Sequence, residues 1–167
     1  ELRERAQLSE AQLKALARSD AFCELGLSRR EASWQAIASD HLPLFAGLTP
    51  SPAPPLPKAT EAEDIFADLE QPGLTLRRHP VALIREELTA LGARSARELK
   101  DSRDGETLTL AGLATLRQRP STARGVVFLS LEDEHGSMSI IVPPRLAEEA
   151  RHELSASLLL ARGVVER

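Results

Sequence analysis

The chain has 167 residues, enough for one ordinary domain or two small ones. A hydrophobic fraction of 42% is sufficient for a core, and a net charge of −4 excludes a protein that coats nucleic acid by bulk charge. The single cysteine, Cys23, excludes an internal disulfide and a cysteine-based zinc site, and it fits a reducing cytosol.

Short helices are predicted over residues 8–39, and we assign residues 1–39 to a helical module. Ser9 with Gln12, and Ser28 with Glu31, form capping boxes that begin helices. A further short helix, "SDAFCELGL", is expected between them and to stop at Gly26, a natural left-handed residue. The last helix carries Ala32, Trp34 and Ile37, and Cys23 is expected to be buried.

A linker is predicted over residues 40–72. Six of the eleven prolines lie between Pro43 and Pro57, which favours extended polyproline II over helix. Residues 59–70 then hold five acids and no base, and their apolar residues indicate a short amphipathic element.

A helical connector is predicted over residues 73–105. The run "RRHPVALIREELTALG" predicts one helix, with His79 as its cap, Pro80 at its first position and Gly92 at its end. "SARELK" predicts a short second helix, with Ser95 and Glu98 as another capping box.

From Glu106 the apolar period changes to two, and residues 106–167 are assigned to a β domain. The expected strands are "TLTLAGLATLRQRP" with a bulge at Gly112, "GVVFLSLEDEHG", "SMSIIVPP" and "LLLARGVV". A helix, "PRLAEEARHELSAS", precedes the last strand. The order β-β-β-α-β predicts an oligonucleotide/oligosaccharide-binding (OB) barrel that lacks its fifth strand. The fold class is therefore expected to be α+β.

The blocks "LARSDAFCELGLSRREASW" and "LTLAGLATLRQRPSTARGVVFLSLEDEHGSMSIIVPP" resemble the C-terminal part of bacterial C-family DNA polymerases. The similarity is greatest to the error-prone, damage-induced branch related to the replicative polymerase III alpha subunit. The resemblance implies helix-hairpin-helix-like helices, a connector and an OB domain. Ser121 departs from an expected Gly, and Arg124 from a common Lys, and both departures keep a flexible or basic loop.

The resemblance also implies a parent chain that is a DNA-directed DNA polymerase and needs magnesium. None of the family's metal-binding carboxylates matches a position here, so no catalytic residue, cofactor or metal is assigned to this chain. The chain does not start with Met, and we expect it to be a non-catalytic fragment of such a polymerase.

Template or single-stranded DNA is the first expected partner of the OB face. Arg117, Arg119 and Arg124 lie in eight residues without an acid, and Phe128 alternates outward if Val127 and Leu129 point inward. The alternative is a solvated loop with Phe128 packed inside. The neighbouring acids Glu132, Asp133 and Glu134 count against DNA.

The helical turn is a second candidate for DNA contact, through Gly26, Ser28, Arg29 and Arg30. Backbone N–H groups at such a turn can hold a phosphate. Basic side chains in a first helical turn oppose the helix dipole, which favours a functional reason for Arg29 and Arg30. The alternative is a solvated first turn without a ligand.

A sliding clamp is the third expected partner. "HLPLF", which comprises His41, Leu42, Pro43, Leu44 and Phe45, is similar to the peptides that bacterial clamps accept, with His41 in place of Gln. A proline-stiffened peptide loses little entropy on docking. The alternative is that its apolar residues fold back near Trp34.

The preferred interpretation is a non-catalytic region that guides template DNA and receives partner proteins. The rival is an OB-fold interaction platform within the mutagenesis complex, with little DNA binding. A stand-alone OB protein of RNA or tRNA metabolism is a more distant alternative.

Overall fold

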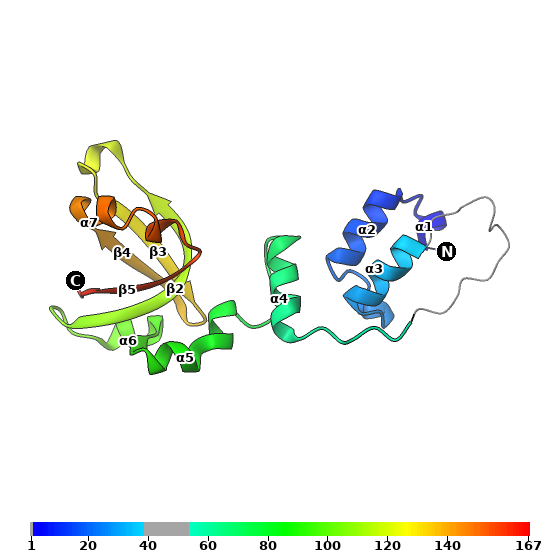
Figure 1. The fold of residues 1–167 in the computed structure, drawn as a ribbon, viewed down its shortest axis with the longest axis horizontal. Coiled ribbons are helices and arrows are strands. Elements are labelled where there is room, and N and C mark those ends of the chain that lie inside the picture. Colours follow the sequence, from blue (N-terminus) through cyan, green and yellow to red (C-terminus); the bar gives the residue numbers. More distant parts are fainter. Residues whose placement is uncertain (1, 39–53) are drawn as a thin grey trace. The chain divides into compact units, whose positions relative to one another are not determined.

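A computed structural model of the chain describes residues 2–38 and 54–167 (Figure 1). The chain divides into two compact units, Glu1–Arg77 and Arg78–Arg167. The first unit is helical and the second combines short helices with a five-stranded sheet, so the α+β class is confirmed. No described helix has the length and apolarity that a membrane crossing requires.

The first unit begins with α1 (Leu2–Arg5), α2 (Glu10–Arg18), the 3-10 helix η1 (Cys23–Leu25) and α3 (Arg29–Ala38). The Ser9 side chain accepts from the Gln12 N–H at 3.2 Å, so the predicted capping box begins α2. Gly26 has φ +76°, the left-handed conformation expected of it, and ends η1.

The core of the helical unit is built from small residues. Its buried members on the helices are Ala17, Ala32 and Ala36, and Phe22 packs with them. Trp34 and Ile37 of α3 lie outside this core, 46% and 58% exposed. Cys23 is also exposed, contrary to expectation, because the η1 turn directs Phe22 inward instead.

The acidic segment forms α4 (Glu61–Glu70), with Thr60 and Glu63 as its capping box. Ile65 and Asp68 of this helix are buried, whereas Phe66 is 65% exposed. The amphipathic element predicted here is therefore a helix, and a charged residue occupies part of its buried side.

The second unit opens with the 3-10 helix η3 (Pro80–Ile84), α5 (Arg85–Ala90), the short strand β1 (Ala93–Arg94) and α6 (Ala96–Asp101). The single helix predicted for this stretch is broken at Ile84, where the 3-10 helix ends with φ −119°, outside the α-helical range, and α5 begins at the next residue. His79 caps η3 as expected: its Nδ1 accepts from the Val81 N–H at 3.2 Å. Ser95 and Glu98 form the predicted capping box of α6.

All four predicted strands are present. They are β2 (Thr107–Gln118), β3 (Val127–Asp133), β4 (Gly136–Val142) and β5 (Leu158–Val164). Between them lie the 3-10 helices η4 (Ser121–Ala123) and η5 (Glu153–Ser155) and the helix α7 (Pro144–Glu149). The predicted helix after β4 thus ends earlier than expected, and a turn separates α7 from η5.

The sheet is open, so the expectation of a closed barrel is wrong. The strand order is β1-β2-β3-β4, with β5 paired to β2 and β1 parallel to β2. Within the described residues, β4 pairs only with β3 and β5 pairs only with β2. The fifth strand is β1, which comes from the connector. Figure 1 shows β2 as a long curved strand that joins both halves of the sheet.

The bulge expected at Gly112 lies instead between Ala114 and Leu116. Side chains from all the long strands meet on the inner side of the sheet, where Leu131 and Met138 are almost fully buried. Val81 and Leu88 pack with Ala93 and Ala111, so the connector shares a core with the sheet.

Candidate nucleic-acid interface

The outer face of β2, β3 and β4 carries two registered rows of side chains. Gln118, Phe128 and Ile141 are cross-strand neighbours, as are Leu116, Ser130 and Ser139. Phe128 is 39% exposed and Leu129 is buried, so the predicted alternation along β3 is confirmed. The face is thus mixed apolar and polar, and it holds one aromatic ring on which a base could stack.

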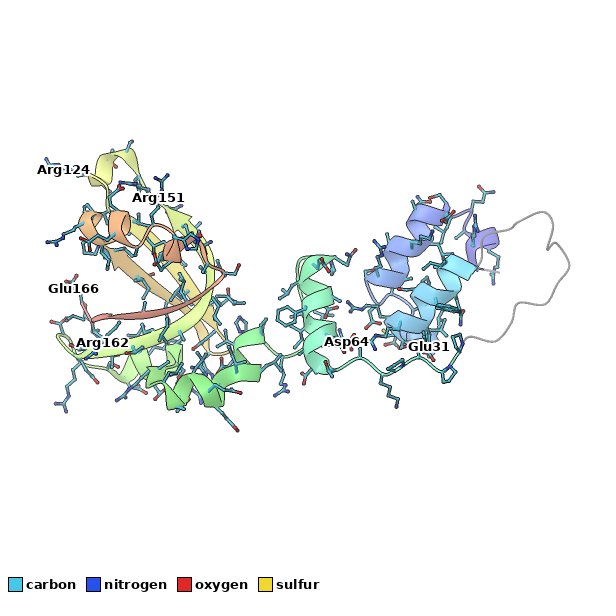
Figure 2. All side chains as sticks on the ribbon, in the orientation of Figure 1. Glu31, Asp64, Arg124, Arg151, Arg162 and Glu166 are labelled. Carbon is cyan, nitrogen blue, oxygen red and sulfur yellow. The ribbon has the colours of Figure 1, made fainter. Side chains whose placement is uncertain are left out.

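The loop before β3 displays Arg124. Arg124 has φ +48° and ends η4, and Gly125 follows with φ +91°. These left-handed residues turn the chain sharply, and Figure 2 shows Arg124 at the tip of the loop, pointing away from the sheet. No hydrogen bond or ion pair joins Arg124 to another residue of the described chain. Its guanidinium is therefore available to an external anion.

Arg117 has a structural role that was not predicted. Its Nε donates to the Leu154 carbonyl at 2.7 Å, and Nη2 donates to the carbonyl of Ala156. These bonds tie β2 to the segment that leads into β5. Arg117 is therefore committed to backbone acceptors, although it remains exposed.

Arg119 forms an ion pair with Glu148 on α7. Its Nη2 lies 2.5 Å from Oε1 of Glu148, and the side chains are 52% and 59% exposed. The hydrogen bond and positive charge of Arg119 lower the pKa of Glu148, and the nearby charge of Arg151 lowers it further. Sequence reasoning missed Glu148 and Arg151 because they lie about thirty residues along the chain from Arg119, beyond the reach of local patterns.

The acids that counted against DNA binding are partly neutralised inside the unit. Arg85 contacts Asp133 at 3.0 Å and Glu134 at 2.6 Å, and the Asp133 side chain is 0% exposed. Asp133 also accepts from the N–H groups of Ala96 and His135, each at 2.8 Å. The hydrogen bond from Arg85 lowers the pKa of Glu134. This cluster therefore fastens α5 and α6 to the β3–β4 turn.

The residues of the helical turn are engaged within their own unit. The Ser28 hydroxyl and N–H both donate to Glu31, and the Gly26 N–H donates to the Cys23 carbonyl. Arg30 donates to Glu63 at 2.9 Å and to the Pro57 carbonyl at 2.8 Å.

Arg29 lies in an ionic network with its side chain only 10% exposed. It forms an ion pair with Asp68 and lies 3.8 Å from Asp20 and 3.9 Å from Asp64. DNA contact by this turn stays a prediction, and the geometry gives Arg29 and Arg30 acidic partners on or near α4.

The clamp-like peptide, His41–Phe45, lies outside the described residues. Trp34, against which it was expected to fold in the alternative interpretation, is half-exposed. Across residues 2–38 and 54–167, no group of three or more His, Cys, Asp or Glu side chains could hold a metal ion.

Comparison with known proteins assigns the chain to a family. No protein-family profile matches it. It is 47% identical over 161 residues to an error-prone DNA polymerase of Burkholderia mallei (strain ATCC 23344), a match that covers 96% of this chain and 15% of the relative.

Relatives with the same name are found in Anaeromyxobacter sp. (strain K), at 46% identity over 171 residues, and in Idiomarina loihiensis (strain ATCC BAA-735 / DSM 15497 / L2-TR), at 41% over 162 residues. These matches cover 100% and 95% of this chain, and 15% and 16% of the relatives. The chain thus spans about 15% of the length of the relatives it matches. With this identity along nearly its whole length, the chain belongs to the error-prone DNA polymerase family and matches one segment of its members.

Proposed function

We propose that this chain is the non-catalytic C-terminal region of an error-prone translesion DNA polymerase, and that its sheet unit contacts single-stranded template DNA. The observation that carries the proposal is the exposed pair of Arg124 and Phe128, which flank the start of β3. Arg124 has a guanidinium without a partner in the described chain, and the ring of Phe128 points outward. The names of the relatives support DNA as the ligand class. On this view the helical unit is a helix-hairpin-helix-like module and the open sheet is an incomplete OB fold.

Catalysis is assigned to parts of the parent protein outside this chain. Nucleotidyl transfer of this kind uses magnesium held by clustered carboxylates. The described residues offer no such cluster, and Asp20, Asp64, Asp68 and Asp133 are committed to arginines. Under this proposal the chain positions or retains template DNA.

The chemistry of the outer face fits a single strand better than a duplex. Arg124 can pair with a backbone phosphate, and Phe128 presents a flat surface to a base. Leu116 and Ile141 add apolar area beside the ring, and Ser130 and Ser139 contribute hydroxyl groups without charge. No side chain in these two rows is acidic, and the acid on the same side of β3 is Glu132, in the next row.

The test is binding of a fluorescent oligothymidylate, followed by anisotropy from about 20 to about 300 mM salt, a range over which phosphate contacts weaken measurably. Phe128→Ala should weaken binding roughly ten-fold, since one stacked base contributes about 1–3 kcal/mol. Arg124→Gln should weaken binding and reduce the slope of log K against log salt by about 0.7, the value for one phosphate on a single strand. Arg162→Gln is the matched control, because Arg162 lies on β5 far from Arg124 (Figure 2).

The rival function is a protein-interaction platform, favoured by the exposure of Leu116 (46%) and Ile141 (58%) on the same face. Absence of oligonucleotide binding at the lowest salt, in all proteins, would support this rival and remove the DNA proposal. Binding that weakens steeply with salt supports DNA.

We also propose that residues 41–45 dock on the sliding clamp. Contacts of the residues before and after this peptide support its docking on the clamp. Helix α3 ends at Ala38, and Arg30 of the same helix donates to the Pro57 carbonyl. A peptide whose flanking residues are both fixed has fewer conformations to lose on docking.

Clamp docking is tested by pulldown with wild type and the double variant Leu44→Ala/Phe45→Ala. Anchor residues of this kind carry most of the binding energy in short peptides, so the variant should lose most of the retained clamp. The matched control is Leu74→Ala/Leu76→Ala, which truncates exposed leucines outside the peptide. Equal retention of wild type and the first variant rules the docking out.

A further inference from the structure

The Arg119–Glu148 pair has a geometry that is not explained by local helix pairing. Arg119 follows β2, and Glu148 belongs to α7, so the pair joins distant segments. By contrast, Arg145 and Glu149 form an ordinary i,i+4 pair on α7, with side chains 91% and 60% exposed. The two glutamates are adjacent in sequence, and only Glu148 is directed to an arginine of the candidate interface.

The arginine is set in place by its surroundings. A Cβ atom at Gly125 would lie 3.5 Å from Nη2 of Arg119 and 3.4 Å from the Cβ of Pro144. Both distances are ordinary van der Waals contacts, so Gly125 and Pro144 lie beside the guanidinium, which occupies the space between the η4 loop and the start of α7. Arg124, the unengaged cation, immediately precedes this glycine.

A second arginine acts on the same carboxylate. Arg151 is exposed in the turn that follows α7, and its positive charge stabilises the ionised form of Glu148 together with Arg119. One carboxylate thus neutralises part of the positive charge of two arginines, beside the loop that carries a third.

We propose that Glu148 occupies the place of a DNA backbone phosphate at Arg119 and competes with the strand for this arginine. The inference rests on the proposed DNA contact and names the phosphate subsite within it. A guanidinium binds carboxylate and phosphate oxyanions with the same forked geometry. The pair is more than half exposed, and such pairs contribute little stability, so a phosphate displaces the carboxylate at small cost.

Loss of the Glu148 charge should therefore strengthen DNA binding, whereas most substitutions at an interface weaken it. Replacing Glu148 by Gln frees Arg119, so single-stranded DNA should bind more tightly. The competing pair is exposed and weak, so removal of this competition should lower the apparent Kd by at most about five-fold. The slope of log K against log salt should steepen by about 0.7 if the released Arg119 binds one further phosphate.

The experiment compares wild type, Glu148→Gln and Glu149→Gln in the oligothymidylate titration. Glu149→Gln makes the same change of charge on the neighbouring residue and releases Arg145 on α7, so it reports the effect of net charge and of a freed arginine other than Arg119. The double variant Arg119→Gln/Glu148→Gln should lose the increase in affinity, because the released arginine is then absent. Thermal unfolding of each variant confirms that the fold is kept.

The outcomes separate this inference from the function on which it rests. An increase in affinity for Glu148→Gln that exceeds the increase for Glu149→Gln, and that disappears in the double variant, supports the phosphate subsite. Equal increases in affinity for both single variants, or no increase for either, would overturn the phosphate subsite. In that case DNA binding by the wild type would still support the proposed DNA contact. If neither wild type nor any variant binds at low salt, the proposed function itself has failed, and the subsite with it.

Discussion

At Gly112, the backbone of β2 runs directly against the backbone of β3. A Cβ atom added there would lie 2.8 Å from the Glu132 carbonyl oxygen and 3.0 Å from its nitrogen. Both atoms belong to the paired ladder and cannot move aside as a flexible side chain could. The glycine was recognised in the sequence as a special position, but its role is close approach and not a bulge.

Gly112→Ala should therefore destabilise the sheet unit by about 1–3 kcal/mol, the usual cost of overpacking. Urea unfolding followed by circular dichroism measures this change. Gly163→Ala on β5 is the control, because its added Cβ meets nothing within 4 Å. Comparable stability of the two variants would show that β2 and β3 can separate without cost.

At the scale of elements, α4 is held by charge as well as by apolar packing. Arg77 contacts Asp20 at 2.8 Å and Asp68 at 2.7 Å, and Arg29 contacts Asp68 from α3. Thr75 donates a further hydrogen bond to Asp68 at 2.7 Å. The acidic segment assigned to a linker is thus a helix attached to the helical unit.

The stability of this attachment should depend on pH. Burial tends to raise the pKa of Asp68, but hydrogen bonds from Arg29, Thr75 and Arg77 outweigh it and lower the pKa below its ordinary value. Because the folded pKa is the lower one, the stabilisation is full above the unfolded value and is lost as pH falls through the folded value. The protection factors of the α4 amides, which correct exchange rates for the intrinsic effect of pH, should therefore fall below about pH 4.

Asp68→Asn is the informative variant for this titration, because it keeps the shape and removes the charge. It should exchange faster at neutral pH and lose much of the acid dependence between about pH 5 and about pH 2, the range in which a paired Asp titrates. Glu70→Gln, an exposed change on the same helix, serves as the control. Acid dependence that is unchanged in Asp68→Asn would assign the effect to other carboxylates.

At the scale of the whole molecule, the connector belongs to the sheet unit. β1 pairs in parallel with β2 through Ala93 and Arg94, and Val81 and Leu88 pack on Ala111. A β domain that begins at residue 106, as the change of hydrophobic period indicated, would lack these contacts. The compact unit begins at Arg78.

A fragment of residues 78–167 should therefore fold cooperatively, whereas residues 106–167 should not. The shorter piece loses the buried side chains of Val81, Leu88, Ala93 and Ala96, and Asp133 loses its partner Arg85. Loss of one partner of a buried ion pair alone costs about 3–5 kcal/mol, a large part of the stability of a small domain. Thermal unfolding of both fragments tests this prediction. A cooperative unfolding transition for residues 106–167 would contradict it.

The sequence by itself determined the features that depend on neighbours a few residues apart. The capping boxes at Ser9 and Ser95, the left-handed Gly26 and the outward Phe128 were all predicted, because caps, turns and strand alternation are encoded locally. The similarity to error-prone polymerases could also be recognised from short blocks of residues.

Only the tertiary structure decided which distant charges meet and which strand edges pair. Arg29 with Asp68, Arg119 with Glu148 and Arg85 with Asp133 each join segments separated by at least 29 residues. The parallel pairing of β1 and the open edges of the sheet are equally non-local. Such contacts depend on how whole elements pack, since an arginine has many possible partners and burial and geometry select one.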